Sequence, residues 1–125
     1  MHKGFYRKVS NQDQGDEGMA IATDSIIEVV KRYIEELKKN GIKIQEAIIF
    51  GSFVKGTAKE WSDIDIALVS PDFTGDRFED RRRIIPMRRK IDSRIEPIPF
   101  RPEDFDNGEM FAEEIKRTGV RLDLS

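Results

Sequence analysis

Two short apolar segments, joined through a glycine-serine pair, constrain the fold of this chain more than any other feature. The first segment, 45–50, is mostly apolar and runs directly into Gly51 and Ser52. The second, 64–69, is rich in branched residues and has the same short length. Both are typical of buried strands. Because glycine permits a tight turn and a close backbone approach, we predict that the first strand ends at Gly51. A helical turn over 53–58 would then direct free N–H groups toward the same spot, which favours an anion.

Two aspartates precede and begin the second segment. Asp63 and Asp65 are separated by one residue, Ile64, and strand side chains alternate between the two faces of a sheet. Both carboxylates are therefore predicted to project from one face, while Ile64 and Ile66 pack in the core. Such a pair can bind a hard cation such as magnesium, which takes oxygen ligands and keeps places open for phosphate oxygens. Two ions, roughly 3.5–4 Å apart, would activate an attacking hydroxyl and stabilise a leaving oxygen.

A third carboxylate usually completes a site of this kind, and Glu96 is the candidate. It lies in the segment 94–100, RIEPIPF, in which two isoleucines stand among polar or proline positions. We predict a short third strand here, at an edge of the sheet or ending early, because its prolines remove ladder donors. Asp92 is the alternative third acid.

The stretch GSFVKGTAKEWSDIDIALV resembles the signature of the minimal nucleotidyltransferases of the DNA polymerase beta superfamily, which is glycine-serine, ten residues and Asp-x-Asp. The agreement extends to a basic residue, the glycine after it and the Ser-Asp-hydrophobic-Asp ending. Glutamate as the third acid departs from the commoner aspartate. The resemblance implies a nucleotide site and a metal site made of a few residues. Nucleotide binding would fall to Gly51, Ser52 and Lys55, and catalysis and metal binding to Asp63, Asp65 and Glu96.

The resemblance also implies an activity. It is the magnesium-dependent transfer of a nucleoside monophosphate, AMP from ATP in the simplest case, to an acceptor hydroxyl with release of pyrophosphate. Two Mg²⁺ ions and ATP or another nucleoside triphosphate are the expected cofactor and substrate. A protein acceptor is the first choice, and the family offers a specific one. This chain would be the antitoxin of a toxin-antitoxin pair whose partner is a helical HEPN ribonuclease. A homo-oligomer is the other partner considered.

Each part of the motif also has a simpler interpretation. An Asp-x-Asp pair alone is commonly a solvated strand end, and a lysine such as Lys55 in a polar turn is more often only solvated than bound to phosphate. A binding module of the same fold without turnover is the competing function. A third class is an RNA-binding protein that uses the basic cluster 81–90, for which we would expect steep salt dependence. The simpler interpretation of that cluster is a charged outer helix face.

Length and composition bound the remaining classes. The 125 residues suit one domain. A net charge of −2, with 37% charged residues, gives no global basic field, so nucleic-acid binding is not favoured. The absence of cysteine excludes disulfides and thiolate metal sites. Neither a secretory signal nor a long apolar span is present, which predicts a cytoplasmic chain that does not enter membranes.

The other segments complete a small α/β (α+β) domain of the polymerase-beta-like nucleotidyltransferase fold. We predict a mixed sheet of three to five strands with helices on one face and the acids on the other. Helices are predicted over 25–39, 77–91 with a break at Pro86, 102–105 and 109–118, and a last strand over 120–124. The last helix is expected to place Met110, Phe111 and Ile115 inward. Residues 1–18 form a polar, flexible N-terminal leader, so the nucleotidyltransferase domain is 19–125.

Overall fold

A four-stranded mixed sheet forms the centre of the computed structural model, which describes residues 24–59 and 61–124. Its strands are β1 (Glu46–Phe50), β2 (Ile64–Val69), β3 (Ile95–Phe100) and β4 (Val120–Arg121), in the order β3-β2-β1-β4. β1 is antiparallel to β2 and β4, whereas β2 and β3 are parallel. The predicted fold class and mixed sheet are confirmed. The predicted leader, 1–18, lies outside the described residues.

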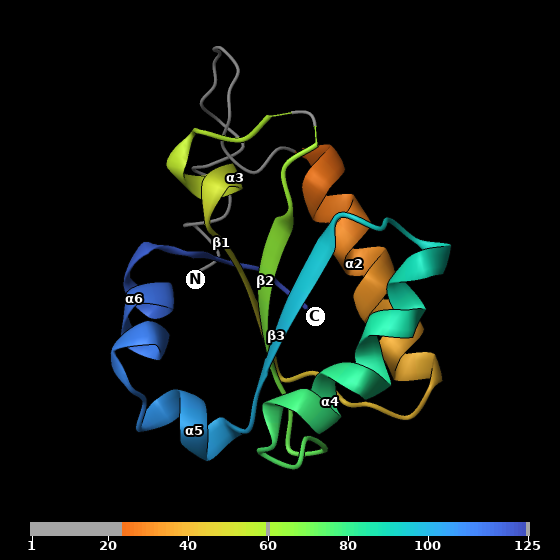
Figure 1. Cartoon of the computed structure of the whole chain (residues 1–125), viewed down its shortest axis with the longest axis vertical. Coiled ribbons are helices and arrows are strands. Elements are labelled where there is room, and N and C mark those ends of the chain that lie inside the picture. The colour runs from red at the N-terminus through yellow and green to blue at the C-terminus, as the bar shows by residue number, and fades with distance from the viewer. Residues whose placement is uncertain (1–23, 60, 125) are drawn as a thin grey trace.

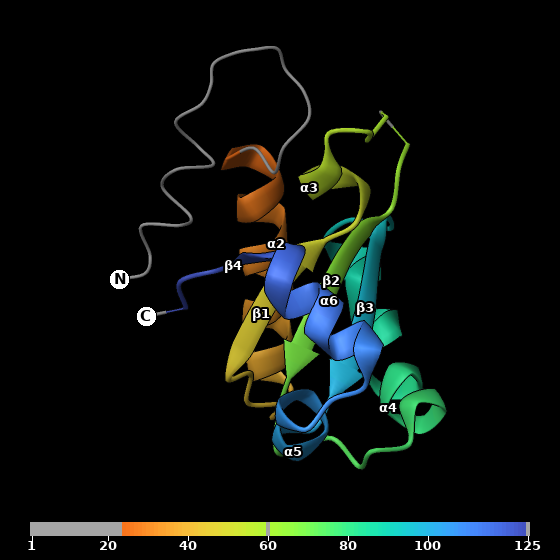
Figure 2. The same ribbon diagram turned by 90° about the vertical axis from the view of Figure 1, so that its left-hand side faces the viewer.

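The helices flank this sheet. They are α2 (Asp24–Lys39), α3 (Ser52–Lys55), α4 (Arg77–Ile84), the 3-10 helix η1 (Ile85–Lys90), α5 (Pro102–Asp106) and α6 (Met110–Thr118). Pro86 stands in the first turn of η1, so the predicted break in the 77–91 segment is confirmed. Figure 1 shows the sheet nearly edge-on, with α2 on one side and α5 and α6 on the other. In Figure 2 α6 lies across the front of the sheet.

The larger core lies between α2 and one face of the sheet. The apolar residues of α2 recur at helical spacing and are all buried, as predicted: Ile26, Ile27, Val30, Tyr33, Ile34 and Leu37. They share one core with alternate residues of the strands, Ala47 and Ile49 in β1, Ile64, Ile66 and Leu68 in β2, and Ile95 in β3. Because strand side chains alternate, Asp65 and Glu96 belong to the opposite face. As predicted, α2 therefore lies on the face of the sheet opposite these acids.

The second core lies on that opposite face, which makes the expectation of helices on one face only wrong. Phe105 of α5 and Ala112 and Ile115 of α6 pack there against Ile48, Ala67, Val69 and Phe100 of the strands. The physical reason is that the part of β2 after Asp65 is apolar on both faces. That part of the strand is therefore buried on both sides of the sheet. The acids lie at the other end of this face.

The inward residues of α6 also differ from the prediction. Met110 is 87% exposed and Phe111 is 40% exposed, whereas Ala112 and Ile115 are buried. Residues three apart share a helix face, so a stripe through Ala112 and Ile115 turns Met110 outward. Phe111 still makes an edge contact with Phe50, at 5.8 Å between ring centroids.

β3 lies at an edge of the sheet, which confirms the prediction from Pro97 and Pro99. The carbonyls of Arg94 and Phe100 accept hydrogen bonds from the N–H groups of β2 and of the residue that follows it. The carbonyl of Ile95 bonds instead to an arginine side chain. Alternate backbone groups of a strand point to opposite sides, so the prolines take positions whose missing N–H would face away from β2. No ladder bond is lost to them.

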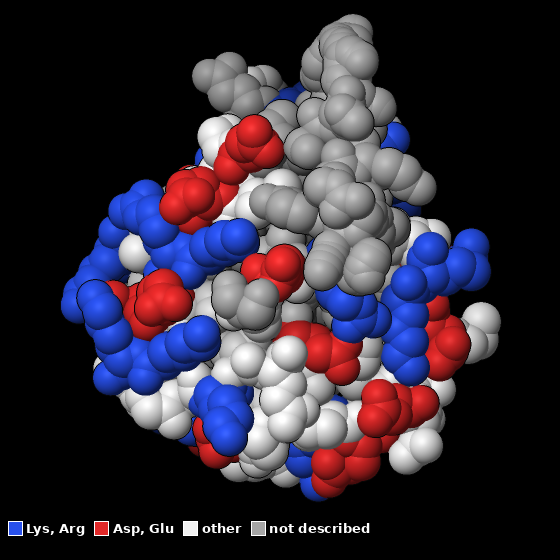
Figure 3. Space-filling model, turned by 180° about the vertical axis from the view of Figure 1, so that it is seen from behind, with Lys and Arg blue, Asp and Glu red and all other residues white. Residues whose placement is uncertain are grey.

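The outer face of α2 is charged but mixed in sign. Seen from behind in Figure 3, basic side chains gather on the side of the molecule on which α2 lies, with acidic side chains between them. The exposed charged residues of the helix beyond its first turn are Glu28, Arg32, Glu35, Lys38 and Lys39. Lys38 and Glu35 form an exposed ion pair at 3.8 Å. Such a surface offers no broad field of one sign.

In the part of the chain that the structure describes, no helix combines the length and apolarity needed to cross a membrane.

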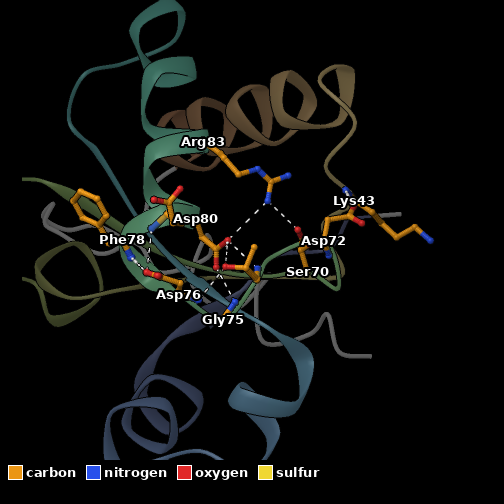
Figure 4. Close-up of polar contacts among 10 residues, drawn as sticks. Lys43, Ser70, Asp72, Gly75, Asp76, Phe78, Asp80 and Arg83 are labelled. Carbon is orange, nitrogen blue, oxygen red and sulfur yellow. Dashed lines mark hydrogen bonds and ion pairs between the residues drawn. The ribbon is translucent and has the colours of Figure 1, made fainter.

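A buried carboxylate organises the loop between β2 and α4. Asp80 is 1% exposed and accepts hydrogen bonds from the N–H and hydroxyl of Thr74, at 2.8 and 3.0 Å, and from the N–H of Gly75, at 3.1 Å (Figure 4). Asp76 then caps α4 by accepting from the N–H groups of Phe78 and Glu79. The loop is thus attached to the helix by its own polar groups, in addition to Phe73, which is buried in the larger core with Ile84 of α4.

Asp80→Ala would leave these three donors, which are partly buried, without their partner. We expect a loss of about 3 kcal/mol in the free energy of unfolding, measured by urea denaturation. Glu79→Ala is the matched control, because Glu79 is an exposed neighbour whose carboxylate pairs with Arg82, and it should change stability by less than about 0.5 kcal/mol. Equal losses in the two variants would contradict this account of the loop.

Candidate active site

Gly51 forms a sharp turn between β1 and α3. Its φ of 80° and ψ of −149° lie in a region that residues with a side chain rarely adopt. The N–H groups of Val54 and Lys55 both donate to the carbonyl of Gly51, at 3.0 Å. A Cβ at position 51 would lie 2.2 Å from Oδ2 of Asp65. The turn and the carboxylate are therefore in direct contact, and only glycine allows both the dihedral angle and the approach.

The acids stand in a row across one face of the sheet. Asp65 is the cross-strand partner of Phe50 in β1 and of Glu96 in β3. Partners in register share a face, and neighbouring strands lie about 4.8 Å apart. Asp63 comes two residues before Asp65, just ahead of β2, and so falls on the same side. The structure places the three acids of the sequence prediction at the open end of this face.

The three acids act on one another electrostatically. Burial, together with the negative charges of Asp63 and Glu96, raises the pKa of Asp65 from its ordinary value of 3.8 to about 6. A carboxylate repelled by two others gains most from a cation placed among them. Asp65 is therefore the centre of the acidic group.

Glu96 has two partners that the sequence did not reveal. Its Oε2 lies 2.6 Å from Nη2 of Arg81, and its Oε1 lies 3.3 Å from Nη1 of Arg88. The three side chains are each between 27% and 29% exposed, so these pairs are partly shielded from water. The arginines come from α4 and η1, which pack beside the edge strand β3. The only sequence signal was the basic run itself, whose simplest interpretation was an outer helix face.

The other candidates occupy less central positions. Asp92, the alternative third acid, is bound to Arg94, with Oδ2 to Nη2 at 2.8 Å. Hydrogen bonding from Arg94 lowers the pKa of Asp92, and Asp92 is not among the groups that act on Asp65. Ser52 is half-buried at the start of α3, beside the Gly51 turn, whereas Lys55 is exposed at its end. Glu96 is thus better placed than Asp92.

The fit to a metal ion is partial. Across residues 24–59 and 61–124, no three acidic, histidine or cysteine side chains converge closely enough to hold an ion. Asp63 and Asp65 offer carboxylate oxygens, the ligands that magnesium prefers, and their mutual repulsion favours a cation. The carboxylate of Glu96 is engaged by its arginines. The donors on β2 suit one ion, and the two-ion arrangement stays a prediction.

The contact between Gly51 and Asp65 can be tested by adding a methyl group. We expect Gly51→Ala to lose about 1–3 kcal/mol of stability and to displace the Asp65 carboxylate, because the new Cβ overlaps Oδ2. Gly56→Ala is the matched control, since Gly56 also has a positive φ, 83°, but a Cβ there meets nothing within 4 Å. Urea unfolding and the carboxyl NMR signal of Asp65 report the two effects. A shifted Asp65 signal in Gly56→Ala, or none in Gly51→Ala, would contradict the contact.

The pKa of Asp65 gives a second test. Without divalent ions, NMR titration of its carboxyl should give a pKa of about 6, and Asp63→Asn should lower that pKa by removing a negative neighbour. Because the pKa of Asp65 is higher in the folded than in the unfolded state, the fold favours the protonated carboxyl. This group therefore contributes its full stability below pH 3.8, and the contribution is lost as the pH rises through 6. Asp106→Asn, an exposed change in α5, should leave the titration unaltered. An ordinary pKa for Asp65 would contradict its burial among acids.

Comparison with known proteins agrees with this geometry. The family model of the nucleotidyltransferase domain matches residues 30–120. A protein of Methanocaldococcus jannaschii, named as a putative protein adenylyltransferase, is 41% identical over 51 residues. That match covers 38% of this chain and 58% of the relative, so the chain spans little more than half of the relative's length.

A solved structure gives the fold independently. The crystal structure of a putative nucleotidyltransferase from Sulfolobus solfataricus superposes with a TM-score of 0.55 over 78% of each chain, at 23% identity. At that identity the likeness shows the fold alone. The family model, in contrast, spans most of the described chain and includes the Gly51 turn, the acids of β2 and Glu96. This chain therefore belongs to the nucleotidyltransferase domain family.

Proposed function

We propose that this chain is a magnesium-dependent nucleotidyltransferase that moves AMP from ATP to a hydroxyl of a protein. The observation that carries the proposal is the contact between the Gly51 turn and Asp65, because it sets a turn suited to phosphate directly against a pair of carboxylates. Family membership supports nucleotidyl transfer in general. The name of the M. jannaschii relative supports AMP as the group and a protein as the acceptor.

Each residue of the site has a proposed part. Gly51 and Ser52 hold the triphosphate against the start of α3, and Lys55 neutralises part of its charge. Asp63 and Asp65 would hold the magnesium, which when bound neutralises the phosphate charge that builds up during transfer. The protein otherwise contributes position, since it fixes the phosphate turn and the carboxylates on one rigid sheet.

The proposed reaction makes one bond and breaks one. The oxygen of the acceptor hydroxyl attacks the α-phosphorus of ATP and forms a new P–O bond. The bond between that phosphorus and the bridging oxygen breaks, and pyrophosphate leaves with the bonding electrons. The hydroxyl proton is released to water, because the carboxylates of Asp63 and Asp65 are assigned to the metal.

The acceptor is the finer part of the proposal. A helical HEPN-type ribonuclease is the partner that the family resemblance implies, with this chain as the antitoxin that modifies it. The 81–90 cluster does not favour RNA binding, because most of its basic side chains are engaged within the protein. Those with acidic or carbonyl partners are Arg81, Arg82, Arg83, Arg88 and Lys90.

A binding module of the same fold, without turnover, remains the second candidate. One observation favours it, namely the pairing of Glu96 with two arginines, which removes the third acid from the metal ligands in this arrangement. Such a module would bind nucleotide or partner through the same face and transfer nothing.

The test is nucleotide transfer to candidate acceptors. With ATP and Mg²⁺, intact-mass spectrometry should show one added AMP on a HEPN-type partner, and Asp63→Asn or Asp65→Asn should reduce the rate about 100-fold or more. Asp106→Asn is the control, because it makes the same chemical change on an exposed part of α5. Calorimetry with ATP and Mg²⁺ distinguishes the second candidate, the binding module, from the enzyme.

Binding that is lost in Asp65→Asn without any adduct on any acceptor would favour the module over the enzyme. An adduct formed equally by wild type and by both aspartate variants would overturn the site itself.

A further inference from the structure

Two arginines bind both the backbone of the edge strand β3 and the side chain of Glu96. Arg81 donates from Nη1 to the carbonyl of Pro97 at 3.0 Å, while its Nη2 contacts the Glu96 carboxylate at 2.6 Å. Arg88 donates from Nη1 to the carbonyl of Ile95 at 2.7 Å and lies 3.3 Å from the same carboxylate. Each guanidinium is thus fixed both to the backbone beside residue 96 and to its side chain. We call this arrangement the arginine clamp.

The clamp follows from the position of β3 in the sheet. Because β3 is an edge strand, the outward carbonyls of Ile95 and Pro97 have no neighbouring strand and are open to side-chain donors. A guanidinium carries five N–H donors in a rigid fork, so one arginine can satisfy a carbonyl and a carboxylate together. Two such forks fix the direction of the Glu96 carboxylate.

The clamp also changes the charge of the site. Asp63, Asp65 and Glu96 together would carry three negative charges, and the arginines set two positive charges beside them. Positive charges at this range weaken the attraction of the acids for a free divalent cation. The same charges attract a polyphosphate, which is the anionic substrate class of the proposed function. The clamp therefore favours a metal that arrives with a nucleotide over a metal alone.

We propose that Arg81 and Arg88 are positioning residues that withhold Glu96 from divalent ions until a nucleoside triphosphate binds. The phosphates compete for the guanidinium groups, and the freed carboxylate of Glu96 then joins Asp63 and Asp65. This inference deepens the proposed function and rests on its metal site. It also explains why the three acids stand in a row without converging as metal ligands among the described residues.

The neighbouring basic residues provide a matched control. Arg82 follows Arg81 in α4, but its Nη1 pairs with Glu79 at 3.1 Å and it is 63% exposed. It carries the same charge on the same helix without a contact to Glu96. A change at Arg82 therefore reports the general effect of one lost positive charge, and any excess at Arg81 or Arg88 reports the clamp.

The experiment titrates Mn²⁺ into the nucleotide-free protein and follows the free ion by electron paramagnetic resonance. We expect Arg81→Gln and Arg88→Gln to bind Mn²⁺ about tenfold more tightly than wild type, and Arg82→Gln to bind it nearly as wild type does. Arg88→Lys keeps the charge and should restore part of the wild-type behaviour. In the presence of a non-hydrolysable ATP analogue, the wild type should gain more Mn²⁺ affinity than either glutamine variant.

Glu96→Gln tests the clamp without removing an arginine. Because the carboxylate is withheld in the nucleotide-free protein, this variant should lose less Mn²⁺ affinity relative to wild type without nucleotide than with the ATP analogue. Circular dichroism confirms that each variant is folded, and Glu96→Gln decides the outcome if an arginine variant is not.

Three results would overturn the clamp: equal Mn²⁺ affinity in Arg81→Gln, Arg88→Gln and Arg82→Gln; weaker Mn²⁺ binding in either clamp variant; and an equal loss in Glu96→Gln with and without nucleotide. The proposed function fails separately. Absence of Mn²⁺ binding in every protein removes the metal site and the clamp with it, whereas clamp behaviour without AMP transfer to any acceptor removes only the enzyme.

Discussion

The close approach of Gly51 to Asp65 is the contact on which the site depends. It joins the end of β1 to the beginning of β2 at a distance that no side chain at position 51 would permit, since even a Cβ would lie 2.2 Å from the carboxylate. The turn proposed to bind phosphate and the carboxylate proposed to bind metal are therefore in contact with each other. The antiparallel pairing of β1 and β2 supports this contact, because their register places Phe50 directly opposite Asp65.

The second organising feature is the position of β3 at the edge. A strand interrupted by prolines can pair on one side only, and its open side needs donors that the sheet does not supply. Arg81 and Arg88 supply them and at the same time reach Glu96. The charge of the site is thus set partly by helices on the far side of β3. The same two side chains bond to the open edge of the strand and fix the direction of the Glu96 carboxylate.

The sequence supported much of the fold and part of the site. Periodicity located α2 and its buried face, and the alternation around Asp63 and Asp65 placed both acids on one side of β2. Two expectations failed for reasons of packing. The 64–69 run is apolar on both faces, so α5 and α6 cover the face that was expected to lie open. Ala112 and Ile115 form the inward stripe of α6, which turns Met110 to solvent. Periodicity in a short helix did not decide between these stripes.

Local features of the chain determined the Gly51 turn, the Asp-x-Asp spacing on a strand and the edge character of β3, because each depends on backbone preferences of adjacent residues. Only the tertiary structure decided the state of Glu96. Its partners lie 15 and 8 residues earlier, in α4 and η1, and reach it through the packing of those helices against an open strand edge. Ion pairing between elements depends on where whole helices lie, and no local pattern of charge in the sequence records that position.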